Sequence, residues 1–254
     1  MNKLQLNYAA GKPQMYDKNS RIKRAYRIIK TLEDYYGKEK IENLTLLDVG
    51  SSTGIIDNIL ASKFKKVVGV DIDRNAVDFA KKSFKKKNLE FKLDDAMELS
   101  FKKENFDIVI CAQIYEHVPN SQKLLSEIYR VLKPGGVCYF AAINKLWPWE
   151  PHYNLPFLSW LPKTIAHLYV QILGKAKKYY ETPKTYWELS KLTSAFKRVE
   201  YTEKILKNPT KFGYENSIGK VPAPILKMLS PVAKYFVPTL FWLLVKSSDI
   251  KSSD

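Results

Sequence analysis

The chain has 254 residues, of which 45% are hydrophobic, and its formal net charge at pH 7 is +16. This length and apolar content suit one large α/β domain with an insertion, while two cysteines and three scattered histidines offer neither a disulfide framework nor a metal-ligand spacing. The positive charge indicates an anionic partner, which is nucleic acid, a phosphorylated substrate or an anionic membrane surface.

The N-terminal sequence, MNKLQLNYAAGKPQMYDK, contains no apolar segment long enough for a secretion signal. The longest apolar run, residues 235–245, is too short to span a bilayer and is interrupted by Pro238. We therefore expect a cytoplasmic protein, with any membrane contact being peripheral.

Residues 20–36 have apolar side chains at helical spacing, with Ile22, Tyr26, Ile29 and Leu32 on one stripe. After this segment, apolar runs typical of buried strands alternate with segments typical of helices. Strands are expected at residues 44–50, 65–73, 89–95, 106–114 and 137–144, and helices at residues 54–62, 74–87 and 121–136. This alternation predicts a parallel sheet covered by helices on both faces, with a ligand site at the carboxyl ends of the strands.

The alternation pauses over residues 145–184, which are rich in Trp, Tyr and Pro. An apolar helical stripe within this insertion comprises Ile165, Leu168, Tyr169, Ile172 and Leu173. It is interpreted either as a cap packed on the core, or as a lid or membrane-facing surface. A helix at 185–196, a strand at 197–206, a helix within 222–236 and a last strand at 238–246 are expected next, and a disordered tail at 247–254.

The segment LLDVGSSTG, residues 46–54, runs from a strand into a glycine loop and then a helix. A Walker-type phosphate loop is excluded because no Gly-Lys-Ser/Thr ends it. A dinucleotide loop is disfavoured because Ser52 and Ile55 occupy positions that require glycine, and because Asp48 would repel a pyrophosphate.

S-adenosylmethionine fits these residues better. Asp48 suits its ammonium group, and the amides of the loop suit its carboxylate. Asp71, at the end of the second strand, is suited to accept hydrogen bonds from both ribose hydroxyls. Asp95, after the third strand, is suited to accept from the adenine amino group, with Ala96 and Met97 against the ring.

The chain resembles the class I S-adenosylmethionine-dependent methyltransferases over residues 44–144, through LLDVGSSTG, VVGVDIDRNAV, KLDDAMELSF, FDIVICAQIYEHVPN and EIYRVLKPGG in that order. The resemblance implies a single domain with a Rossmann-like three-layer α/β fold. Its seven-stranded sheet would be mostly parallel, with an antiparallel last strand and a helical insertion after strand 5. The cofactor-binding residues that it implies are Asp48, Gly50, Ser51, Ser52, Gly54, Asp71, Ile72, Asp95, Ala96, Met97, Cys111, Ala112 and Gln113. Ser52 departs from the glycine usual in the family, and predicts modest strain at a position suited to positive φ.

The acceptor is less well defined. No Asn/Asp-Pro-Pro-Tyr motif and no Pro-Cys pair follow the fourth strand, which argues against amino-group and cytosine C5 methylation. His117 resembles the Glu-His pair common in small-molecule methyltransferases, and His152 with Glu150 is a candidate base because histidine titrates near neutral pH. No metal ligands are expected.

These observations predict methyl transfer to oxygen or carbon of a small or lipid-linked acceptor, with peripheral contact to an anionic membrane as a further expectation. An RNA methyltransferase is an alternative suggested by the positive charge, although no RNA-binding module is evident. A non-catalytic protein that binds S-adenosylmethionine is a second alternative, suggested by Ser52.

Overall fold

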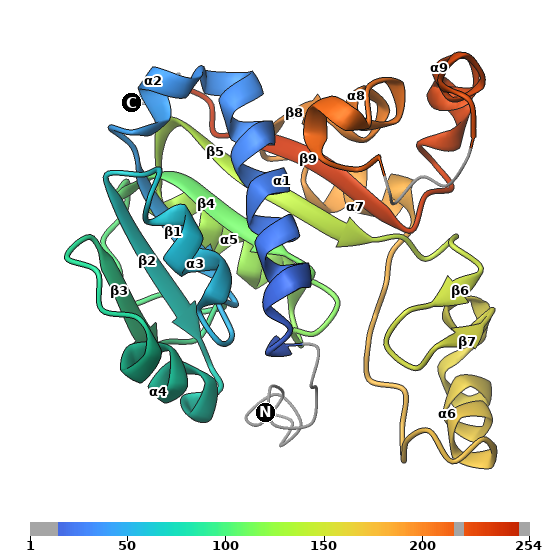
Figure 1. The fold of residues 1–254 in the computed structure, drawn as a ribbon. Coiled ribbons are helices and arrows are strands. Elements are labelled where there is room, and N and C mark those ends of the chain that lie inside the picture. The colour runs from blue at the N-terminus through green and yellow to red at the C-terminus, as the bar shows by residue number, and fades with distance from the viewer. Residues whose placement is uncertain (1–14, 216–220, 249–254) are drawn as a thin grey trace, which may run out of the picture.

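The computed structural model describes residues 15–215 and 221–248, and its centre is a seven-stranded sheet (Figure 1). Its strand order is β3-β2-β1-β4-β5-β9-β8. The strands are β1 Thr45–Val49, β2 Lys66–Asp71, β3 Leu89–Leu93, β4 Phe106–Ala112, β5 Leu132–Ile143, β8 Lys197–Glu200 and β9 Thr239–Val245. The first five are parallel, and β9 runs antiparallel to both β5 and β8. The predicted fold class is therefore confirmed, including the antiparallel last strand and the insertion after β5.

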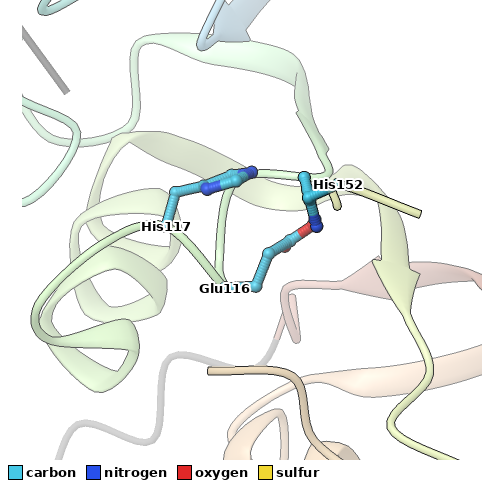
Figure 2. Close-up of side chains that lie close together, drawn as sticks. All are labelled: Glu116, His117 and His152. Atoms are coloured by element: carbon cyan, nitrogen blue, oxygen red, sulfur yellow. The ribbon is translucent and has the colours of Figure 1, made fainter. Parts of the chain in front are cut away.

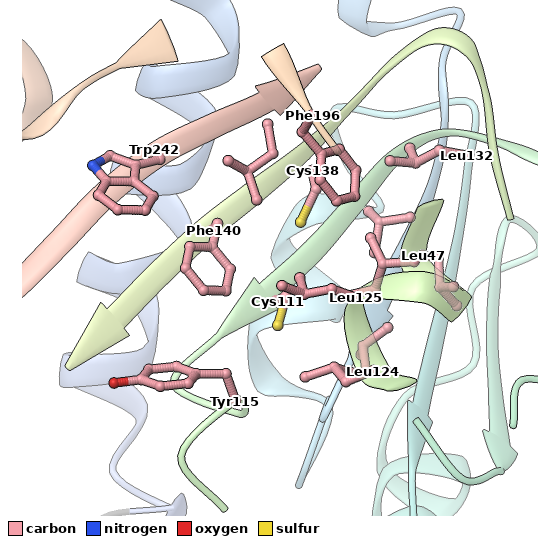
Figure 3. Packing of buried hydrophobic residues seen from close by; sticks show 14 of the residues in the cluster. Leu47, Cys111, Tyr115, Leu124, Leu125, Leu132, Cys138, Phe140, Phe196 and Trp242 are labelled. Atoms are coloured by element: carbon pink, nitrogen blue, oxygen red, sulfur yellow. The ribbon is translucent and has the colours of Figure 1, made fainter. Parts of the chain in front are cut away.

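Strand residues alternate between two hydrophobic cores, as period-two side-chain geometry requires. Leu47 and Val49 of β1 face one core, whereas Leu46 faces the other. The first core lies between the sheet and the helices α5 Ser121–Val131 and α7 Tyr186–Leu192. Figure 3 shows Cys111 and Cys138 within it, among leucine and phenylalanine side chains.

The second core lies between the other sheet face and the helices α1 Lys18–Tyr36, α2 Lys38–Ile41, α3 Ile55–Leu60 and α8 Thr202–Lys207. Together, the two cores give three layers. The remaining helices of the main body are α4 Arg74–Ser83, packed on β3, and α9 Ala223–Ala233. Within the described ranges, no helix has the length and apolar character needed to cross a membrane.

Several predictions about the helices and strands need correction. The helix expected at residues 121–136 ends at Val131, because β5 begins at Leu132, and the helix expected at residues 74–87 ends at Ser83. The strand expected at 197–206 ends at Glu200, and α8 follows it, because Tyr201 N bonds to Phe241 O and the Tyr201 hydroxyl bonds to Asp34. On α1, the buried face consists mainly of Ala25, Ile28, Ile29 and Leu32. Ile22 and Tyr26 of the expected stripe are exposed.

The insertion after β5 forms a separate small unit that extends from the sheet (Figure 1). It contains β6 Trp149–Glu150, β7 Leu155–Pro156, a 3-10 turn at Leu158–Trp160 and α6 Lys163–Ile172. Its own core comprises Leu155, Leu158, Ala166, Val170 and Tyr179.

The expected apolar stripe does not face this core. Ile165, Leu168, Ile172 and Leu173 are exposed, because α6 buries Ala166 and Val170 instead. Only Tyr169 of the stripe packs against the buried residues. The interpretation of this stripe as the packed side of a cap is therefore wrong.

Candidate active site

A cavity of about 440 Å³ lies at the carboxyl ends of the parallel strands, where the topology places a ligand site. Its volume is in the range of small-molecule sites. Eleven of the residues singled out from the sequence line it: Gly50, Ser52, Asp71, Ile72, Asp95, Ala96, Met97, Ala112, Gln113, His117 and His152. The fold thus brings the strand-end motifs and both candidate histidines to one space.

The loop after β1 is shaped by two glycines that the packing requires. Gly50 has φ 83° and Gly54 has φ 72°, and a Cβ atom at Gly54 would lie 2.5 Å from the Phe91 ring. Ser52 adopts φ 51°, in the left-handed region predicted for it. This conformation costs a non-glycine residue on the order of 1 kcal/mol.

Asp71 connects this loop to the end of β2. Its Oδ2 accepts a hydrogen bond from Ser52 N at 2.7 Å, and its Oδ1 accepts one from Asp73 N at 2.9 Å. Burial raises the pKa of Asp71, although these main-chain donors oppose the rise. Because each carboxylate oxygen can accept more than one hydrogen bond, the side chain can still bind a diol in the cavity.

Four predicted cofactor residues do not line the cavity. Asp48 is 5% exposed, and its carboxyl lies beside the fully buried Asp57. Burial raises the pKa of Asp48 to about 7, with a further contribution from Asp71, and burial and Asp48 raise the pKa of Asp57. The other three are Ser51, Gly54 and Cys111, of which Cys111 is fully buried in the core (Figure 3).

Three arginines that the sequence reasoning missed also line the cavity. Arg21, Arg24 and Arg27 project from α1, where their spacing of three residues places them on one side of the helix. This three-residue spacing of arginines, next to the buried stripe of α1, is the sequence pattern that could have predicted them at the cavity. Arg24 and Arg27 also line a second cavity of about 250 Å³, which shares Ala112 and Gln113 with the first.

At the insertion side of the main cavity lies a group of three buried glutamates and two half-buried histidines, which we call the His–Glu cluster: Glu116, His117, Glu150, His152 and Glu181. His152 Nδ1 lies 2.6 Å from Glu150 Oε1, and Tyr153 N donates to Glu150 Oε2 at 2.8 Å. His117 Nδ1 lies 3.8 Å from Glu181 Oε1. The two imidazole rings are 4.8 Å apart and nearly perpendicular.

Burial also affects protonation in this cluster. It raises the pKa of Glu116 to about 7, although the nearby His152 opposes the rise. Burial alone would lower the pKa of His152, but the hydrogen bond and charge of Glu150, with Glu181 and Glu116, raise it. Glu150 does not line the cavity; it lies behind His152 and holds its ring in place.

Comparison with known proteins agrees with this geometry. Residues 47–140 match the family described as Methyltransferase domain. The sheet order, the strand-end cavity and this match over residues 47–140 are features of class I S-adenosylmethionine-dependent methyltransferase domains, whose methyl donor is S-adenosylmethionine.

Among curated proteins, the chain is 32% identical over 102 residues to the ubiquinone biosynthesis O-methyltransferase of Coxiella burnetii, covering 39% of this chain and 44% of that protein. It is 33% identical over 149 residues to the demethylmenaquinone methyltransferase of Lactococcus lactis, covering 56% of this chain and 57% of that protein. The chain thus spans about half the length of these relatives.

A solved structure of an S-adenosylmethionine dependent methyltransferase from Mesorhizobium loti superposes with a TM-score of 0.54. It is 14% identical, and the superposition covers 81% of this chain and 92% of that one. This likeness concerns the fold.

Proposed function

We propose that the protein is an S-adenosylmethionine-dependent methyltransferase that acts on an oxygen or carbon atom of a small, aromatic, quinol-type acceptor. The observation that carries this proposal is the cavity that is lined on one side by the strand-end loops and on the other by His117 and His152. The names of the curated relatives support an acceptor of this class over RNA.

The residues of the cavity fit the cofactor. Asp71 would hold the ribose hydroxyls, and the loop at Gly50 and Ser52 would lie against the methionyl part, with the guanidinium of Arg21 as a cationic group of the cavity wall for its carboxylate. Ile72 and Met97 would cover the adenine ring, and the Asp95 carboxylate would accept a hydrogen bond from the adenine amino group. Bound S-adenosylmethionine supplies a methyl group activated by its sulfonium.

The other requirement for transfer to a hydroxyl is activation of the acceptor oxygen. His152 is placed for this role, because its Nδ1 is engaged by Glu150 and its Nε2 is then the nitrogen left to act on the acceptor. The Tyr153 amide holds Glu150 in turn, so the imidazole orientation is set by the insertion itself. Glu150 is a positioning residue in this scheme.

The test is formation of S-adenosylhomocysteine from S-adenosylmethionine with a panel of hydroxylated aromatic acceptors, including quinols. His152→Ala is expected to lower kcat by about 10²- to 10⁴-fold, which is the usual contribution of an acid–base group. His167→Ala is the matched control, because this third histidine does not line the cavity and accepts a bond from Tyr179 N. Equal activity of wild type and His152→Ala would contradict the role of His152.

We also infer that the acceptor is lipid-linked and that α6 contacts an anionic membrane surface. The exposed apolar residues of α6 include Ile165, Leu168 and Ile172, the last of them 71% exposed. Trp160, at the start of this region, is half-exposed, and lysines 175, 177 and 178 follow the helix and are exposed. An apolar face beside lysines is typical of segments that lie in the headgroup region of anionic bilayers.

A further inference from the structure

Glu116 is a buried carboxylate with unsatisfied hydrogen-bonding capacity. It is 1% exposed, and neither of its side-chain oxygens has a hydrogen-bond partner among the residues that the structure describes. Its main chain is fixed, since Glu116 O accepts a hydrogen bond from Thr182 N at 3.0 Å. A buried carboxylate normally has a cation or donor as its partner, so this arrangement calls for one.

Two imidazole rings stand beside this carboxylate. Glu116, His117 and His152 each present a donor atom, and these three atoms lie within 4.8 Å of one another. Figure 2 shows the three side chains converging from the loop after β4 and from the start of the insertion. Metal–ligand bonds of about 2.1 Å bring donor atoms to about 3–4 Å from one another, so a small closure of these side chains suffices.

The surroundings match those of metal-binding histidines. Glu150 engages Nδ1 of His152 at 2.6 Å, and Glu181 lies 3.8 Å from Nδ1 of His117. Histidine ligands of metals usually place one ring nitrogen against a carboxylate, which orients the other nitrogen toward the metal. Both rings here have such a carboxylate on the Nδ1 side.

The charge of the cluster also favours a cation. Glu116, Glu150 and Glu181 are all nearly fully buried, at 1%, 1% and 3% exposure. The neighbouring ammonium of Lys163 bonds to the main-chain oxygen of Glu181 and not to its carboxylate oxygens. A dication between Glu116 and the two rings would offset this negative charge.

We propose that Glu116, His117 and His152 bind a divalent first-row transition-metal ion at the acceptor side of the cavity. Two imidazoles and one carboxylate favour such an ion over Mg²⁺, which prefers oxygen ligands. Three protein ligands leave coordination positions open, and His117 and His152 line the cavity, so an acceptor oxygen can reach the ion. With the ion bound, His152 Nε2 would be a ligand and the ion, in place of His152, would activate the acceptor hydroxyl. This activation rests on the proposed function, whereas binding of the ion does not.

The test is calorimetric titration of the full chain, first stripped of metal with a chelator, using Zn²⁺ and Mg²⁺ separately. The expected result is one Zn²⁺ per chain and much weaker binding of Mg²⁺. Co²⁺ provides a second readout, because its visible absorption reports nitrogen and oxygen ligands directly. Failure of wild type to bind Zn²⁺ and Co²⁺ would overturn the proposal. Protonation would then be what neutralises the buried carboxylates of the cluster.

Variants place the ion. Glu116→Gln and His152→Ala are each expected to weaken Zn²⁺ binding by at least about a hundredfold, and Glu150→Gln by about 10- to 100-fold, as usual for an outer carboxylate partner. Glu98→Gln, an exposed glutamate, and His167→Ala are controls that should bind Zn²⁺ like wild type. Unchanged Zn²⁺ binding in both Glu116→Gln and His152→Ala would place the ion elsewhere and overturn the proposal.

Two further measurements separate this proposal from the proposed function. Circular dichroism and thermal unfolding establish that each variant folds. Binding of S-adenosylhomocysteine to metal-free protein then reports the methyltransferase proposal independently. Cofactor binding without metal binding would overturn only the metal site, and metal binding without cofactor binding would overturn only the methyltransferase proposal.

Discussion

The two sides of the cavity are held by different kinds of contact. On the strand-end side, Asp71 accepts main-chain hydrogen bonds from Ser52, in the loop after the neighbouring strand β1, and from Asp73, two residues further along the chain. On the insertion side, Glu116 meets His152 only because the insertion packs against the loop after β4. The Asp71 carboxylate therefore has hydrogen-bond donors without a ligand, whereas the Glu116 carboxylate has no hydrogen-bond partner among the described residues.

This difference predicts that cofactor affinity depends on the strand-end side alone. Asp71→Ala is expected to weaken S-adenosylhomocysteine binding about a hundredfold, since it removes charge-assisted hydrogen bonds worth about 1.5–3 kcal/mol. Calorimetry of wild type and variant measures this loss. Asp78→Ala, an exposed aspartate on α4, is the control, and the His152→Ala variant should bind like wild type. An equal loss in His152→Ala would remove the distinction between the two sides.

A second prediction concerns the buried acidic pair behind the strand-end side. The pKa of Asp48 rises from its ordinary 3.8 to about 7 in the folded protein, and the pKa of Asp57 is also raised. The folded protein therefore binds more protons than the unfolded chain between about pH 4 and 7, so this pair lowers stability as pH rises through that range.

Asp57→Asn is expected to relieve this effect. The gain in Tm over wild type should be small near pH 4 and grow to several degrees near pH 8, corresponding to about 2 kcal/mol. Thermal unfolding across this pH range measures it, with Asp78→Asn as the exposed control. A gain in Tm that is independent of pH would show that ionisation of the Asp48–Asp57 pair does not lower the stability of the folded protein.

The smallest expected effect concerns the outer surface of the insertion. Ile172→Glu should lower binding to vesicles of mixed neutral and anionic lipid by about tenfold, because it places a charge on the apolar face of α6. Met228→Glu is the matched control, since Met228 is also 71% exposed but lies on α9. Cosedimentation measures the bound fraction. Equal losses in both variants would contradict a membrane contact specific to α6.

The features that could be predicted from the sequence are those that depend on local patterns of residues. Period-two and period-3.6 patterns identify β1 to β5 and the helices between them, because each pattern is local and the central strands β1, β4 and β5 are mostly buried on both faces. The same reasoning placed Asp71 and Ser52 in the cavity and predicted a helix from about Gly54, which is the N-cap of α3.

The remainder depends on tertiary contacts that no local pattern records. The side that α6 turns outward is decided by Ala166 and Val170, whose small volumes allow close packing. The convergence of Glu116, Glu150 and Glu181 requires the path of the whole insertion. Asp48 was expected at the ligand, but strand alternation directs it toward Asp57 instead.

Ser52 has a consequence for how the loop can change. Its backbone occupies a region that favours glycine, and its hydroxyl has no hydrogen-bond partner among the described residues. Folding alone would therefore favour glycine at this position, and the loop carries unused potential for stabilisation. Both the backbone conformation and the unpaired hydroxyl of Ser52 lower the stability of the folded protein. Substitutions at this position can therefore change ligand affinity and folding stability in opposite directions.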